Sequence, residues 1–287
     1  KIEILHSPRF ILDEASIIID RGCKFGCDFC EYYYCLNGKY ISYNFERIKK
    51  SIDYLSKKGV KKIYIYSASA GNHPKIKDIL RYIEKKNIIA ELQATRIEQL
   101  NEGMLSYFSK NLNHLPLNLD APSERVRKIV KKGSVSDDYI LEIAKKAYDK
   151  YKIKNFSIYY IINYPNETKK DREEIYNFLK RILAIGKNLS INLYINPLFP
   201  SPKTPLERCK MELPEVTYRR LNEIWDMILP LIKKEKFTDT RVYKTSSHHY
   251  FKKQGNISII TISLVDQLIE GLILRGNKKA GELLYDI

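Results

Sequence analysis

The cysteines carry the clearest chemical signal in this 287-residue chain. Of the five, Cys23, Cys27 and Cys30 are spaced C-x3-C-x2-C, and the second CxxC pair that a zinc ribbon needs is absent. Three thiolates on one loop leave the fourth iron of a [4Fe–4S] cluster free to bind a small molecule. The spacing therefore predicts such a cluster, with a structural zinc ion or three unrelated thiols as the alternatives.

The other two cysteines, Cys35 and Cys209, lie outside this motif. We expect both to be packed thiols, because free cysteine is among the most buried residue types, although Cys35 has a ligand or redox role as its alternative. The odd cysteine total and the lack of a secretory apolar core near the start argue against a disulfide framework. We therefore expect a cytoplasmic protein.

The cysteine motif resembles the signature of the radical SAM superfamily, because the aromatic Phe29 stands directly before the last cysteine. The resemblance implies that the three cysteines hold a [4Fe–4S] cluster whose open iron is chelated by S-adenosylmethionine (SAM). It implies an enzyme, a transferase or an oxidoreductase, that cleaves SAM reductively to a 5′-deoxyadenosyl radical, which abstracts hydrogen from a substrate carbon. It also implies an electron donor such as ferredoxin or flavodoxin.

Short β-branched runs alternate with amphipathic helical patterns through most of the chain. We expect strands at residues 15–20, 61–66, 88–92, 115–119, 155–162 and 189–195, and helices at 45–58, 75–85, 98–110, 123–132, 136–150 and 169–185. This alternation predicts βαβ units whose strands form a parallel sheet. Right-handed crossovers would curl that sheet into a full or partial barrel. The predicted fold class is therefore α/β, a partial (β/α)6 barrel of the radical SAM type with a mainly helical C-terminal extension.

The alternation stops near residue 205, which divides the chain into two expected parts. Residues 1–206 are predicted to form the core barrel, and residues 207–287 an extension packed on it, with helices at 214–234 and 257–275. The apolar stretch 257–274 is interrupted by Asp266 and Glu270, so it is predicted to be a buried helix and no membrane span.

The loop after the second strand is the first candidate for binding SAM. Members of the family often have Gly-Gly-Glu there, whereas this loop offers Ser67, Ser69 and Gly71 and no acidic residue, and is similar to a Ser-rich variant. Small side chains let the backbone approach a ligand. An ordinary strand-to-helix turn is the alternative.

The loop after the fourth strand is the second candidate. Its segment 120–128 resembles the one that lies beside the SAM ribose and carboxylate in methylthiotransferase-like and elongator-like members, which points to Asp120 and Ser123. Ser123 is also a natural helix N-cap, and both roles are compatible. Lys132 is a candidate partner of the SAM carboxylate, with a solvated basic face as the alternative.

Two later loops complete the resemblance. Asn163 replaces the glycine of a Gly-x-Pro-x-Glu-Thr segment after the fifth strand, and Leu198 and Phe199 follow the sixth strand as candidates to line an adenine pocket. The stretch 274–281 resembles a tail of members that often carry a cobalamin domain upstream. An Asp-x-His-x-x-Gly loop is absent, so cobalamin would come from a domain before residue 1 or from a partner. The sequence singles out no catalytic acid or base.

The net charge of +16 is spread over many lysine pairs, which suits RNA or simply a solvated surface. Three functions follow. The first is a radical SAM enzyme that methylates or joins a carbon of a small molecule, lipid or protein. The second is a tRNA-modifying radical SAM enzyme, although the lack of a second cysteine cluster argues against a methylthiotransferase. The third is an Fe–S electron-transfer protein without SAM chemistry.

Overall fold

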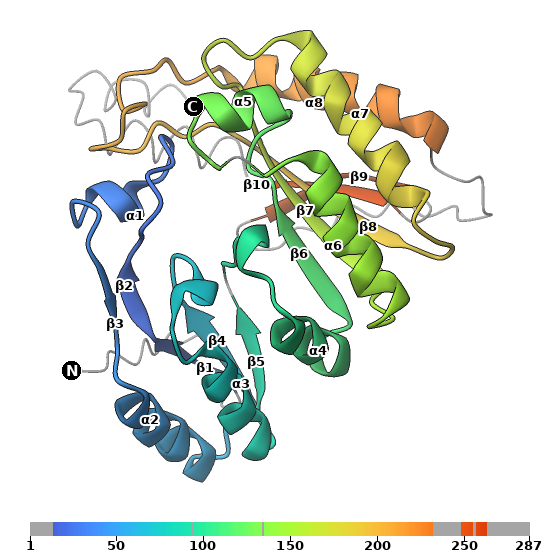
Figure 1. The fold of residues 1–287 in the computed structure, drawn as a ribbon. Helices are drawn as coiled ribbons and strands as arrows, with labels where there is room; N and C mark the ends of the chain where they lie inside the picture. The colour runs from blue at the N-terminus through green and yellow to red at the C-terminus, as the bar shows by residue number, and fades with distance from the viewer. Residues whose placement is uncertain (1–13, 93, 134, 232–247, 255–256, 263–287) are drawn as a thin grey trace.

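The structure is a computed structural model, and it describes residues 14–92, 94–133, 135–231, 248–254 and 257–262. Six parallel strands alternate with helices, which confirms the predicted α/β fold. They are β1 (Glu14–Ile18), β4 (Lys62–Tyr66), β5 (Ile89–Leu92), β6 (His114–Asn118), β7 (Asn155–Ile162) and β8 (Ser190–Pro197). These strands belong to two hydrogen-bonded sheets, β1-β4-β5 and β6-β7-β8, and β10 (Ile257–Ile262) and β9 (His248–Gln254) extend the second sheet beyond β8 (Figure 1).

The helices that connect these strands cover the outer faces of the two sheets (Figure 1). Most begin at a side chain that caps the first turn: Asn44, Asn101, Ser136 and Thr168 each accept a hydrogen bond from a backbone N–H. The helices are α2 (Phe45–Lys57), α3 (Ile76–Lys85), α4 (Glu102–Asn111), α6 (Asp137–Asp149) and α7 (Lys169–Leu183).

Short elements that sequence patterns did not predict surround the cysteine loop. The strands β2 (Asp20–Gly22) and β3 (Tyr40–Ser42) pair antiparallel, and the single-turn helix α1 (Glu31–Tyr34) lies between them in the chain. Short helices also follow three of the parallel strands. Two of them, η1 (Ala70–Asn72) and η2 (Ile97–Gln99), were not predicted as short helices, whereas α5 (Glu124–Ile129) lies within the helix predicted at 123–132.

The C-terminal extension differs from its prediction. Helix α8 (Pro214–Ile228) begins where expected and continues into η3 (Leu229–Leu231), but Ile257–Ile262 is strand β10 and not a helix. This strand runs parallel to β8 and antiparallel to β9 (His248–Gln254). A short apolar run is compatible with either a buried strand or a buried helix. In this chain the run forms a strand because it pairs with β8. Residues 263–275 of that predicted helix lie outside the described residues.

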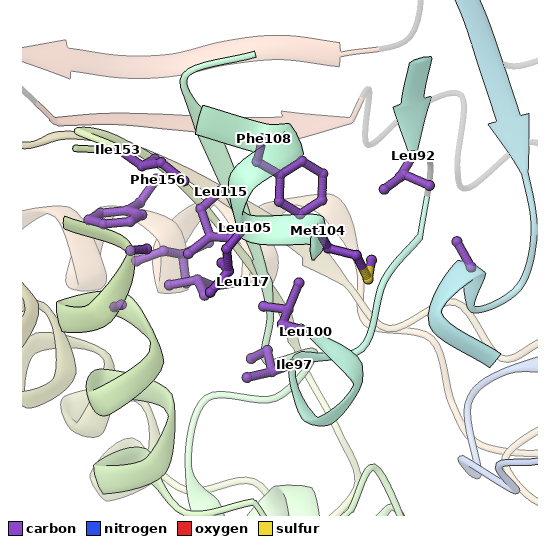
Figure 2. Packing of buried hydrophobic residues seen from close by; sticks show 14 of the residues in the cluster. Leu92, Ile97, Leu100, Met104, Leu105, Phe108, Leu115, Leu117, Ile153 and Phe156 are labelled. Atoms are coloured by element: carbon purple, nitrogen blue, oxygen red, sulfur yellow. The ribbon is translucent and has the colours of Figure 1, made fainter. Parts of the chain in front are cut away.

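The main hydrophobic core lies between the strands and the helices. Figure 2 shows Met104, Leu105 and Phe108 of α4 beside Leu115 and Leu117 of β6, all five essentially inaccessible to solvent. The apolar side chains of each strand therefore point outward, toward the helices. No helix in the part of the chain that the structure describes is long and apolar enough to cross a membrane.

Candidate functional site

The inner face of the strands is polar. On β4, Ile63 and Ile65 belong to the core under the helices, and side chains alternate along a strand, so the residues between them face the barrel interior. On β4 and the other strands, this alternation places nine polar or aromatic-hydroxyl residues on the inner face: Lys62, Tyr64, Glu91, His114, Asn118, Ser157, Tyr159, Asn192 and Tyr194. A closed (β/α)8 barrel fills its interior with branched aliphatic residues, so this interior is suited to a polar ligand.

These inner residues contact one another across strands. His114 on β6 and Ser157 on β7 are joined by a hydrogen bond of 2.7 Å between Nε2 and Oγ, and burial lowers the pKa of the imidazole. The rings of Tyr159 and Tyr194 stack with centroids 4.5 Å apart and planes 10° apart. The interior therefore offers neutral hydrogen-bonding groups and an aromatic surface.

The cysteine loop closes one end of this interior. It runs from β2 to α1, and it buries Cys23 and Cys27 while Cys30 is partly exposed. All three thiols line one cavity of about 430 Å³, together with residues at the carboxyl ends of β4, β5 and β6. This volume falls in the range of small-molecule sites, about 300–1,000 Å³. The sequence-predicted cluster ligands thus share one cavity with the strand ends.

Each of the three thiols has an N–H donor, and for Cys30 it is the Tyr32 backbone N–H. The Phe25 backbone N–H donates to Cys23 Sγ at 3.5 Å, and Arg96 Nη1 donates to Cys27 Sγ at 3.3 Å. The Arg96 guanidinium also lies 3.9 Å from the centroid of the Phe25 ring and bonds Glu98 Oε1 with Nε at 3.0 Å. Hydrogen bonds and positive charge favour thiolate sulfur, so this donor set fits an anionic iron–sulfur centre.

Burial favours the protonated form of two of these thiols, Cys23 and Cys30, while no metal binds. Burial raises the pKa of Cys30 to about 11 and also raises the pKa of Cys23. In the described part of the chain, no three His, Cys, Asp or Glu side chains converge on one point as a single metal ion requires. The ligands of a cluster bind different irons, so they need not converge on one point.

Asp120 and Lys132 face the same cavity and form an ion pair with each other. Asp120 has a left-handed backbone (φ 54°), and its N–H donates to the Tyr159 carbonyl at 2.8 Å. The turn thereby directs the carboxylate toward the cysteine loop. Both residues were predicted from the sequence to contact SAM. In the structure, the charge of each is neutralised by the other.

Of the three residues predicted on the loop after β4 to contact SAM, only Ser67 lines the cavity. Its Oγ accepts the Ser69 N–H at 3.1 Å. Ser69 is buried and bonds Gln99, and a Cβ on Gly71 would collide with the Gln99 side chain. Ser69 and Gly71 therefore pack the loop against η2 and do not line the cavity.

Of the three apolar residues predicted to contact SAM, only Phe29 lines the cavity. It packs edge-on against Tyr164, with ring centroids 6.0 Å apart. Leu198 is 2% exposed in a small cluster with Tyr164, behind Phe29. Phe199 is half-buried and lies outside the cavity lining. Leu198 thus supports the aromatic wall from behind.

Ser123 and Asn163 are placed at helix junctions and not on the cavity. Ser123 caps α5 and donates to Asp171 Oδ1 at 2.7 Å, which joins α5 to the start of α7. Asn163 has φ of 72°, and its Nδ2 donates to Thr217 Oγ1 of α8 at 2.8 Å. Asn163 tolerates the left-handed conformation that the family's glycine would adopt, and it anchors α8.

The structure adds cavity residues that the sequence did not reveal. Thr95, Arg96, Glu91 and His114 line the cavity. Arg96 and Thr95 follow β5 directly, so a rule that inspects the carboxyl end of every parallel strand would have found them. Glu91 and His114 were detectable only as polar residues in otherwise apolar strands.

Comparisons with known proteins bear on the family and the fold of the chain. The family described as "Radical SAM superfamily" matches residues 17–179, more than half of the chain. One curated relative is "Uncharacterized protein MJ0966" of Methanocaldococcus jannaschii, which is 26% identical over 66% of this chain and 41% of its own length. Another is "Threonylcarbamoyladenosine tRNA methylthiotransferase MtaB" of Aquifex aeolicus, which is 25% identical over 69% of this chain and 48% of its own length. The chain thus spans less than half the length of these two relatives.

Solved structures share the fold at low sequence identity. Streptococcus suis SuiB bound to S-adenosylmethionine superposes with a TM-score of 0.57 at 15% identity, over 88% of this chain and 50% of that one. The radical S-adenosylmethionine methyltransferase TsrM from Kitasatospora setae, with cobalamin and a [4Fe–4S] cluster bound, gives 0.52 at 14% identity, over 67% of this chain and 38% of that one.

Proposed function

The chain belongs to the radical SAM superfamily, whose members use a [4Fe–4S] cluster and SAM, and we propose that it is an enzyme of this kind that acts on a polar substrate. Cys23, Cys27 and Cys30 would hold the cluster. When bound, the cluster supplies the electron that splits SAM into methionine and a 5′-deoxyadenosyl radical, which takes a hydrogen atom from a substrate carbon. The observation that carries the proposal is the placement of all three thiols on one cavity that opens into the barrel.

The residues around the thiols prepare the cavity for this chemistry. Arg96 brings a positive charge to the Cys27 sulfur, and that charge offsets the negative charge that thiolate ligands bring. Phe29 and Tyr164 form an aromatic wall beside the loop. Such a wall excludes water and offers an aromatic surface to an adenine ring. Lys132 stands where it can exchange its Asp120 partner for a ligand carboxylate.

The polar inner wall narrows the class of substrate. A fatty chain would cover the His114–Ser157 and Lys62–Glu91 pairs with hydrocarbon and would offer no hydrogen bond to their remaining donor and acceptor sites, which costs free energy. A substrate rich in hydroxyl, amide or ring-nitrogen groups would instead form hydrogen bonds with them. A sugar, nucleoside or peptide therefore fits this interior, and the lipid alternative does not.

A tRNA-modifying enzyme is the second candidate. Two observations favour it: the relative of Aquifex aeolicus is named a tRNA methylthiotransferase, and the chain carries a net charge of +16. A nucleoside turned out of an RNA stack is also a polar ligand of the class that the inner wall fits. The five cysteines contain no second motif of the C-x3-C-x2-C kind, so insertion of sulfur from a second cluster is not part of this proposal.

One anaerobic experiment tests the proposal. Iron and sulfide would be added to the purified chain, the cluster reduced with dithionite, SAM supplied, and 5′-deoxyadenosine measured by mass spectrometry. Cys27→Ala should lose both the cluster and the product. Cys209→Ala is the matched control, because it removes a thiol that does not line the cavity, and it should keep both.

The outcomes separate the alternatives. Product in the wild type and in Cys209→Ala, but not in Cys27→Ala, supports the proposed enzyme. A stable cluster that neither binds nor cleaves SAM would instead favour an electron-transfer protein. For the second candidate, binding to bulk tRNA should weaken steeply between 50 and 200 mM salt, because each neutralised phosphate releases a counterion. Weak binding that ignores salt would count against an RNA substrate.

A further inference from the structure

The carboxylate of Asp20 is buried next to the cysteine loop with one oxygen unused. Asp20 is 3% exposed. Its Oδ2 accepts hydrogen bonds from Ser67 Oγ at 2.7 Å and from the Tyr40 hydroxyl at 3.0 Å. Its Oδ1 is buried as well, and no residue in the described ranges donates to it. A buried acceptor without a donor is unfavourable, and such groups in native proteins usually have a reason.

Asp20 also differs from the other carboxylates that line this interior. Asp120 is paired with Lys132, and Glu91 with Lys62 at 2.6 Å. Asp20 faces only two hydroxyl groups and forms no ion pair within the described part of the chain. Asp20 is therefore a buried carboxylate beside the interior that has no positively charged donor among the described residues.

The position of Asp20 connects it with the cysteine cavity. It borders a neighbouring cavity of about 390 Å³, and Tyr32, Tyr66, Ser67 and Ala68 line both cavities. Tyr32 and Tyr66 are 51% and 43% exposed, so the lining that the two cavities share includes two accessible rings. A ligand that lies against Ser67 and Ala68 is thus adjacent to Asp20.

Resting on the proposed function, we propose that Asp20 accepts an N–H of the α-amino group of SAM through Oδ1. Among the groups of SAM, this amine is the donor that a carboxylate prefers, since it is charged in solution and strongly polarised on a metal. The loop of Ser67 to Ala70 carries no acidic side chain, and Asp20 supplies one from the neighbouring strand. Ser67 holds the carboxylate in place by donating to its other oxygen.

Binding measurements on the cluster-loaded protein test this inference. The affinity for SAM and for 5′-methylthioadenosine, which lacks the amino and carboxylate groups, would be measured by anaerobic equilibrium dialysis. Asp20→Asn should weaken SAM binding at least about tenfold and leave 5′-methylthioadenosine binding unchanged. Asp53→Asn is the matched control, because Asp53 also accepts from a tyrosine hydroxyl, Tyr82 at 2.8 Å, but lies on the outer helix α2.

The results distinguish this inference from the proposed function. If Asp20→Asn binds SAM as tightly as the wild type and still forms 5′-deoxyadenosine, Asp20 does not receive the amine, yet the enzyme class stands. Equal weakening of both ligands would place the contact at the adenosine half and overturn the assignment. A wild-type protein that carries its cluster and binds no SAM would overturn the proposed function itself. Iron content and the circular dichroism spectrum of each variant verify that the comparison is between folded, loaded proteins.

Discussion

Arg96 reaches Cys27 from 69 residues away, and its guanidinium lies 3.3 Å from the cysteine sulfur. The same guanidinium is 7% exposed and is held by Glu98 and by the Lys132 carbonyl. It therefore cannot turn away from the sulfur without breaking several hydrogen bonds. The cysteine loop and the end of β5 are joined by this contact into one structural unit.

The charge of Arg96 should set the reduction potential of the cluster. The positive charge of Arg96 stabilises the reduced cluster, which carries one more negative charge than the oxidised one. Arg96→Gln removes that charge, so the reduction potential should fall on the order of tens of millivolts. An anaerobic redox titration followed by electron paramagnetic resonance measures it. Arg96→Lys keeps the charge and should stay closer to the wild type. Equal shifts in the two variants would show that geometry, and not charge, is responsible.

Asp20 should make stability depend on pH. Burial raises its pKa from 3.8 to about 6, so the folded chain binds this proton more tightly than the unfolded chain does. The free energy of unfolding should thus fall as pH rises from about 4 to about 6, by about 2–3 kcal/mol for this group. Asp20→Asn lacks the titration, so its stability relative to the wild type should rise over that window. Urea unfolding at pH 4.5 and pH 7 measures the difference, and a constant difference would contradict the prediction.

Gly71 should be required by packing. A Cβ at this position meets the Gln99 side chain, so Gly71→Ala should destabilise the chain by about 1–3 kcal/mol. The nearest atom is the Gln99 Cβ, so Gln99→Gly removes the obstacle, and the Gly71→Ala/Gln99→Gly double variant should recover most of that loss relative to Gln99→Gly alone. A double-mutant cycle from thermal unfolding tests this coupling. Additive effects would show that Gly71 serves the loop in another way.

Ser123 should act as a helix cap. Its hydroxyl accepts the Val126 N–H at 3.2 Å and donates to the buried Asp171, so Ser123→Ala should cost about 1–2 kcal/mol of stability. Because Ser123 does not line the cavity, the affinity of the folded variant for SAM should match that of the wild type. Weaker SAM binding in a variant with native circular dichroism would show that Ser123 contacts the ligand after all.

Local patterns predicted the elements whose partners are sequence neighbours. The strand at 155–162 has its predicted bounds, since a continuous β-branched and aromatic run bounded by polar residues determines them. The run at 257–262 was predicted as helix, because nothing in it shows that β8 lies ready to pair. The antiparallel pair β2 and β3 was missed for the same reason: the cysteine loop and α1 separate its two short strands.

The site shows the same division. The spacing of Cys23, Cys27 and Cys30 is local, and it was visible in the sequence. Asp20 becomes notable only because Ser67 and Tyr40 occupy one of its oxygens and leave the other, and both come from other elements. Contacts of this kind depend on the register between strands, and a single sequence does not specify that register.

The polar inner wall has a consequence for how this protein can evolve. The aliphatic residues that stabilise the fold face the helices, while the residues that face the interior contribute little to that core. Substitutions such as those at His114 or Tyr159 can therefore change which molecule is accepted while the scaffold keeps its stability. Descendants of one such ancestor can acquire new substrates by altering a few inward-facing side chains, with the cysteine loop and the outer layer inherited unchanged.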